Sequence, residues 1–65
     1  MIDIETIAAE VKKLSSQAVQ AKLNLHDLAE ELPVDWEKIP AVAQRAFDLY
    51  RELEFKRALL RATGA

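Results

Sequence analysis

Nine apolar residues in the first half of the chain are spaced alternately by three and by four positions. They are Ile4, Ile7, Val11, Leu14, Ala18, Ala21, Leu25, Leu28 and Leu32. An α-helix turns once in about 3.6 residues, so this spacing places all nine on one stripe of a single long helix. A heptad pattern of this length is typical of a helix that packs along its whole length against a partner helix.

The same spacing resumes in the second half of the chain. This second stripe consists of Ile39, Val42, Ala46, Leu49, Leu53, Lys56 and Leu60. Ala43, Phe47 and Tyr50 widen it along one flank. The apolar surface of this second helix is therefore wider than a seam between two helices requires.

Two prolines mark the boundary between the helical patterns. Pro33 disfavours helical geometry in Leu32 and lacks the amide that a helix would use, so the first helix is expected to end there. Pro40 suits the first turn of the next helix. Residues 33–39 then form the connection, in which Asp35 is expected to cap a short helical turn.

The expected fold is all-α. It is a single domain over residues 1–65, in which helices at about 4–32 and 40–61 form an antiparallel hairpin because a short loop joins them. Asp3 is the expected N-cap of the first helix. A chain this short rarely buries enough apolar surface to be stable alone, and without cysteine it cannot use disulfides. We therefore expect a four-helix-bundle homodimer or a higher oligomer.

The inner positions of both stripes are the expected core and dimer-forming residues. They are Ile7, Val11, Leu14, Ala18, Ala21, Leu25, Leu28, Leu32, Val42, Ala46, Leu49, Leu53 and Leu60. Ala18 and Ala21 occupy successive core positions in the middle of the first helix. Small side chains there indicate either a tight layer against large partner residues, which we favour, or a ligand cavity inside the bundle.

Val19 and Leu23 lie on the opposite face of the first helix from Ala18 and Ala21, and His26 continues their row. A row of apolar surface residues indicates a protein contact, whereas scattered ones are ordinary on any surface. Both interpretations remain open from the sequence.

Trp36 is the only tryptophan and lies in the connection. It is expected to close the end of the hairpin over Leu28, Leu32 and Ile39. The alternative is an exposed hot spot for a partner, because tryptophan is enriched at such positions.

His26 and Glu30 are four residues apart, so their side chains share one face of the helix. The pair is a candidate for holding a metal ion, but one histidine with carboxylates falls short of a complete ligand set. We favour a solvated acidic end with one contact between the two. The sequence has no nucleophile paired with a base and no Gly-rich phosphate loop, so we expect no catalytic residue, no cofactor and no enzyme.

Eleven acidic residues against nine basic ones give a formal net charge of −2, which disfavours nucleic-acid binding. No apolar run approaches the roughly 20 residues that span a bilayer. Residues 1–5 lack the basic start and apolar stretch of a signal peptide, so we expect a cytoplasmic protein. The charge is uneven, because acidic residues gather near the connection and basic ones near the open end. This asymmetry favours antiparallel self-association.

Residues 11–14, 20–33, 35–40 and 50–53 carry a resemblance to a known family. The most specific part is Leu-His-Asp-Leu-Ala-Glu-x-Leu-Pro at residues 25–33, followed by Trp36. These segments resemble the small Rop-like family associated with NifX in nitrogen-fixation gene clusters, over roughly residues 7 to 57. The resemblance implies a hairpin that forms dimers or larger bundles near nitrogenase maturation genes. It brings no established catalytic residue.

The first functional hypothesis is a non-catalytic accessory protein of nitrogen fixation that acts as a protein-interaction module in nitrogenase assembly or cofactor maturation. Its partners would be a second copy of itself and nitrogenase or its assembly factors. The candidate partner-binding residues are Val19, Leu23, His26, Asp27 and Trp36. The alternatives are a metal or metallocluster carrier that uses His26 and nearby carboxylates, and an RNA-binding four-helix bundle.

Overall fold

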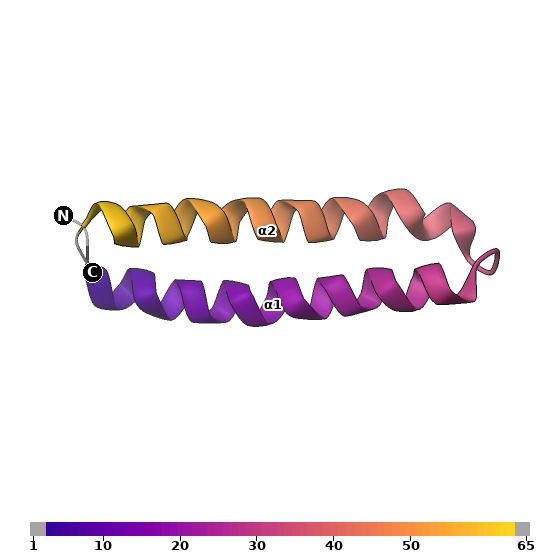
Figure 1. Ribbon diagram of the computed structural model, residues 1–65, viewed down its shortest axis with the longest axis horizontal. Helices are drawn as coiled ribbons and strands as arrows, with labels where there is room; N and C mark the ends of the chain where they lie inside the picture. Colours follow the sequence, from indigo (N-terminus) through magenta and orange to yellow (C-terminus); the bar gives the residue numbers. More distant parts are fainter. Residues whose placement is uncertain (1–2, 64–65) are drawn as a thin grey trace.

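The computed structural model describes residues 3–63, which form two long helices lying side by side (Figure 1). α1 spans Ile4–Glu31 and α2 spans Ile39–Ala62, with a short 3-10 helix, η1, at Trp36–Lys38 between them. The predicted all-α antiparallel hairpin is confirmed. The helix limits expected from the sequence differ from these by one residue at three of the four ends. Of the expected domain, residues 1, 2, 64 and 65 lie outside the described residues.

A side-chain cap begins α1, as the sequence predicts. The Asp3 carboxylate accepts hydrogen bonds from the backbone N–H groups of Glu5 and Thr6, at 3.1 and 3.5 Å. It also accepts a bond of 2.8 Å from the Thr6 hydroxyl. These bonds, that of the Thr6 hydroxyl above all, lower the pKa of Asp3 because they favour the charged carboxylate.

Backbone hydrogen bonds define the connection between the helices. They run from the amides of Val34, Trp36 and Lys38 to the carbonyls of Glu31, Pro33 and Asp35, at 2.9 to 3.3 Å. Pro40 stands in the first turn of α2, as expected. Each turn of the connection is therefore held by its own backbone hydrogen bond.

The short helical turn predicted after Asp35 is present as η1, and Asp35 occupies its N-cap position, but the side chain does not cap it. Asp35 precedes η1, but its side chain makes no capping hydrogen bond. Its backbone is left-handed, with φ at 56°, instead of the extended conformation from which a capping side chain reaches back to free amides. The carboxylate lies 3.6 Å from the Lys38 ammonium instead.

The two helices meet along the predicted stripes. The buried side chains among the described residues are Ile7, Ala18, Ala21, Ala46 and Leu53. Three of these five are alanine, and Ala18 is fully enclosed at 0% exposure. Small side chains at these positions let the helix backbones approach closely, so the middle of the seam is a tight layer.

Most other members of the stripes are only half-buried. They are Val11, Leu14, Leu25, Leu28, Val42, Leu49 and Leu60. Leu32, which the sequence places in the core, is 41% exposed. It lies just past the end of α1, where its backbone has left helical geometry and Pro33 redirects the chain. The result is a thin rod of 47 × 15 × 14 Å, in which each helix covers only one stripe of the other.

An ion pair joins the helices along one side of this rod. The Lys56 ammonium lies 2.8 Å from a Glu10 carboxylate oxygen. The hydrogen bond to Glu10 raises the pKa of Lys56, because it favours the charged form. Lys56, the charged member of the second stripe, thus pairs with Glu10 across the seam between the helices. Within residues 3–63, neither helix carries an apolar stretch long enough to cross a membrane.

Because the core contains few buried side chains, each of them contributes a large share of the free energy of unfolding. Leu53 is 3% exposed, so Leu53→Ala should lower the free energy of unfolding by about 2 kcal/mol or more. Phe55→Ala is the matched control, since it removes a larger side chain that is 61% exposed and should cost at most about 0.5 kcal/mol. Urea unfolding followed by circular dichroism measures both. Equal losses in the two variants would contradict the burial described here.

The ion pair predicts how stability responds to high pH. Because the folded chain raises the pKa of Lys56 above its ordinary 10.5, the pair contributes fully below that pH. Its contribution is lost as the pH rises through the raised value. Glu10→Gln should therefore be less stable than the parent chain at pH 7, and the gap should close above about pH 10.5. A gap of constant size across this range, in unfolding experiments at low salt, would argue against the pair.

Candidate functional site

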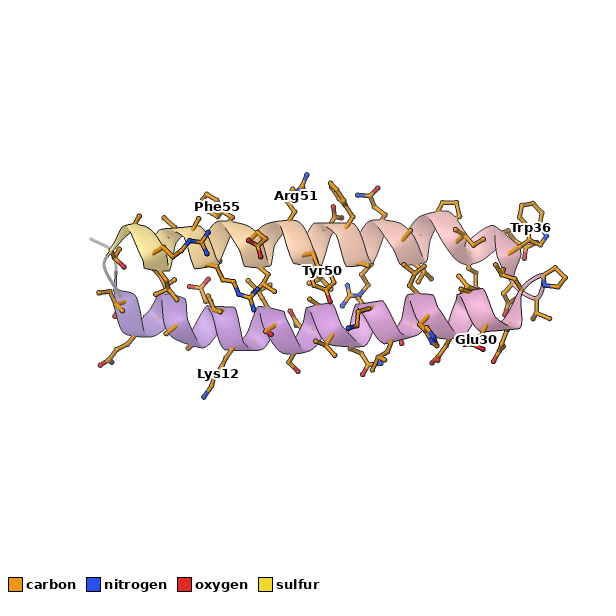
Figure 2. The ribbon with its side chains drawn as sticks, in the orientation of Figure 1. Lys12, Glu30, Trp36, Tyr50, Arg51 and Phe55 are labelled. Carbon is orange, nitrogen blue, oxygen red and sulfur yellow. The ribbon has the colours of Figure 1, made fainter. Side chains whose placement is uncertain are left out.

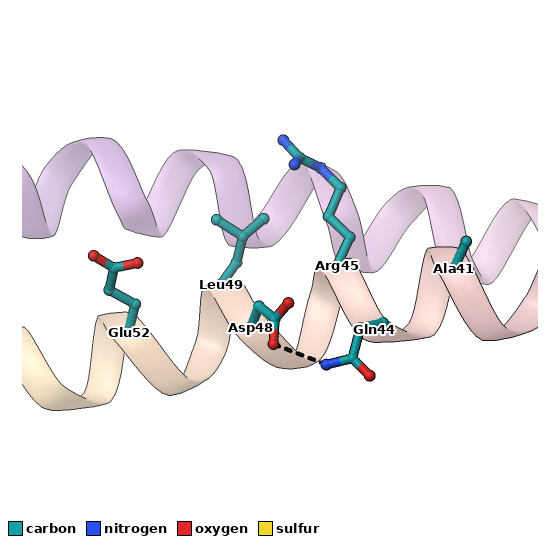
Figure 3. A pocket seen from close by; sticks show the side chains of 6 residues that line it. All are labelled: Ala41, Gln44, Arg45, Asp48, Leu49 and Glu52. Atoms are coloured by element: carbon teal, nitrogen blue, oxygen red, sulfur yellow. Dashed lines mark hydrogen bonds between the residues drawn. The ribbon is translucent and has the colours of Figure 1, made fainter.

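The side of the rod that carries the Glu10–Lys56 pair is polar. A shallow depression on α2, drawn in Figure 3, is lined by Ala41, Gln44, Arg45, Asp48, Leu49 and Glu52. The Gln44 side chain donates a hydrogen bond of 2.8 Å to the Asp48 carboxylate there. The six lining residues include no serine, threonine, cysteine or histidine. Its charged lining side chains are Arg45, Asp48 and Glu52.

The opposite side of the rod carries several exposed apolar side chains. Val19 stands nine residues after Glu10, and Phe47 stands nine residues before Lys56. Nine residues are about two and a half helical turns, so both side chains point away from the ion pair. Val19, Leu23 and Phe47 are exposed, and Tyr50 lies one turn along from Phe47. We refer to Val19, Leu23, Phe47 and Tyr50 as the apolar side.

The outer face of α2 carries a further aromatic residue that the sequence analysis did not single out. Figure 2 shows Arg51 and Phe55 pointing away from α1. The Arg51 guanidinium lies over the Phe47 ring, 5.4 Å from its centre, in a cation–π contact. The regular spacing of four residues from Phe47 to Arg51 to Phe55 is the signal that could have revealed this row.

The structure brings His26 and Glu30 together, as their spacing predicts. His26 Nε2 lies 3.3 Å from a Glu30 carboxylate oxygen, and His26 Nδ1 lies 3.9 Å from Asp27. All three side chains are exposed on α1 near the connection. Across residues 3–63 no group of three or more potential ligands gathers where it could hold a metal ion. The pair therefore forms a surface contact, and a metal site would need ligands from another molecule.

Several basic side chains are engaged by carboxylates. Besides the Lys56–Glu10 pair, Arg51 lies 3.5 Å from Asp48 and Arg57 lies 3.4 Å from Glu54. Pairing of this kind interrupts the continuous positive potential along which a nucleic-acid backbone would bind. The arrangement of these charges does not favour RNA binding.

The prediction that Trp36 closes the end of the hairpin is wrong. Its side chain is 61% exposed at the extreme end of the rod (Figure 2). Leu32, Val34 and Ile39 are also exposed there, with Val34 at 58%. Leu32, Val34 and Trp36 lie in the segment between the two helices, and Ile39 is the first residue of α2. We refer to Leu32, Val34, Trp36 and Ile39 as the tip.

Comparison with known proteins identifies close relatives. The Rop-like family model matches residues 2–65. A UPF0437 protein of Azorhizobium caulinodans is 51% identical over 65 residues, which cover all of this chain and 94% of that protein. One from Trichormus variabilis is 41% identical over 59 residues, which cover 91% of this chain and 69% of that protein. No solved structure matches this chain.

One further relative carries a genomic location in its name. It is the UPF0437 protein in the nifX–nifW intergenic region of Frankia alni. It is 44% identical over 52 residues, which cover 80% of this chain and 63% of that protein.

Proposed function

This chain belongs to the Rop-like family, and from that premise we propose that it is a non-catalytic accessory protein of nitrogen fixation that works through protein contacts. The match confirms the resemblance expected from the sequence. The observation that carries the proposal is the relative in Frankia alni, whose name places it between nifX and nifW. A role in assembling nitrogenase or in maturing its cofactor fits that location.

The surface of the hairpin supports a role in binding proteins. Binding surfaces depend on a few exposed apolar or aromatic anchors, usually with polar residues around them. Exposed Val19, Leu23 and Phe47 on the apolar side, and Trp36 at the tip, are anchors of this kind. His26 and Asp27, two of the residues expected to bind a partner, lie exposed between these two surfaces.

The first contact that we propose is with a second copy of the chain. The single hairpin buries few side chains, and the half-buried edges of its stripes gain cover only from another molecule. The apolar side offers such an interface, since two of these sides packed face to face form a four-helix bundle. An antiparallel arrangement places the acidic connection of one copy beside the more basic open end of the other.

A charge on the apolar side should weaken this dimer. Phe47→Glu places a carboxylate in the proposed interface and should raise the dimer dissociation constant about tenfold or more. Asn24→Glu is the control, because Asn24 stands fourteen residues after Glu10 and so lies on the ion-paired side. Sedimentation equilibrium measures both variants. The same self-association in the two variants would place the interface elsewhere.

Affinity capture tests the proposed role. A tagged copy would be recovered from cells grown with and without fixed nitrogen, and the proteins that accompany it identified by mass spectrometry. We expect a nitrogenase component or an assembly factor only under nitrogen-fixing conditions. Recovery of the chain with itself alone in both conditions would refute an accessory role that depends on other proteins.

A further inference from the structure

The tip gathers exposed apolar side chains at one end of a narrow rod. Trp36 and Val34 are about three-fifths exposed, and Leu32 and Ile39 flank them at the ends of the two helices. Exposing a tryptophan ring to water costs free energy. The ring also makes an effective anchor, because it buries a large area when a partner covers it.

The backbone that presents these side chains makes its own hydrogen bonds. The amides of Val34 and Trp36 donate to the carbonyls of Glu31 and Pro33, at 3.0 and 3.3 Å. A binding surface that is held in place before it meets a partner loses less entropy on binding. The tip is therefore organised in advance as a compact projection.

Acidic residues lie next to the tip residues in the chain. Between residues 30 and 40, the carboxylates of Glu30, Glu31, Asp35 and Glu37 oppose the single charge of Lys38, which leaves a net charge of −3. The Lys38 ammonium already lies 3.6 Å from Asp35. The segment that carries the apolar projection is therefore net negative.

Side-by-side self-association does not cover the apolar side chains of the tip. The rod is 47 Å long and about 15 Å across, so copies that pack side by side cover its flanks and leave its ends free. Tip-to-tip contact between two copies would bring together two surfaces of like charge, which is unfavourable. Nucleic acids and anionic lipid surfaces are repelled by the same carboxylates.

We infer that the tip is the surface through which the hairpin binds another folded protein, and that this protein offers an apolar pocket with a basic rim. Trp36 and Val34 fill the pocket, and the carboxylates meet lysine or arginine side chains around it. The inference rests on the proposed function, because it names the surface that serves the proposed protein contact. The apolar side then remains available for self-association.

The test uses the partner recovered with the tagged chain under nitrogen-fixing conditions, purified and titrated calorimetrically against the full chain. Trp36→Ala and Val34→Ser should each raise the dissociation constant, Trp36→Ala by about thirtyfold. Phe55→Ala is the matched control, because Phe55 is as exposed as Trp36 but lies on the outer face of α2, and it should leave the constant unchanged. Circular dichroism and sedimentation verify that each variant keeps its helices and its self-association.

The role of the acidic residues next to the tip is tested in the same way. Glu37→Gln should weaken binding at low salt and reduce its dependence on salt. Glu5→Gln, near the other end of the rod, should change neither the strength of binding nor its dependence on salt.

The outcomes separate this inference from the proposed function. If the parent chain binds the recovered partner but the tip variants bind equally well, or Phe55→Ala weakens binding as much, the tip is not the surface and the accessory role stands. If Trp36→Ala abolishes self-association, the tip contacts a second copy and the inference is overturned. If no partner is recovered, the inference and the proposed function both fall.

Discussion

The packing of one stripe of α1 against one stripe of α2 is the interaction on which the rest of the structure depends. Its centre is made of alanine, with Ala18 and Ala21 on one helix and Ala46 on the other. Side chains this small let the backbones approach closely, but they bury little apolar area per residue. Ile7 and Leu53 add the larger buried side chains towards the open end. The hairpin is therefore closely packed and thin.

This thin seam determines which side chains remain exposed on the surface. Two helices cover one stripe each, so the wider apolar face of α2 reaches solvent through Phe47 and Tyr50. On the other side of the rod, the charged Glu10–Lys56 pair joins the two helices. The rod thus has an ion-paired side, an apolar side and an apolar tip. In the dimer that we propose, a second hairpin packs against the apolar side, and the tip stays exposed at the end of the rod.

The fold was predictable in detail, because heptad spacing and proline positions act locally and unambiguously. Nine evenly spaced apolar residues define α1, and Pro33 ends it. The candidate site was predictable only in part. The spacing of His26 and Glu30 placed them together, since residues four apart on a helix must share a face. The positions of Trp36 and of the Asp35 carboxylate depend on the path of the connection, which short-range patterns do not specify.

The sequence by itself determined the two helices, their antiparallel order and the stripes through which they meet, because helical periodicity converts spacing directly into geometry. The tertiary structure alone decided that Lys56 reaches Glu10 across the seam and that Val19 and Phe47 lie on the side opposite that pair. It also decided that Trp36 stands in solvent. These features depend on the rotation of each helix against the other and on how far the connection extends past them. The rotation is fixed by contacts between residues far apart in the chain, such as Glu10 and Lys56, and the connection is held by backbone hydrogen bonds between residues three apart.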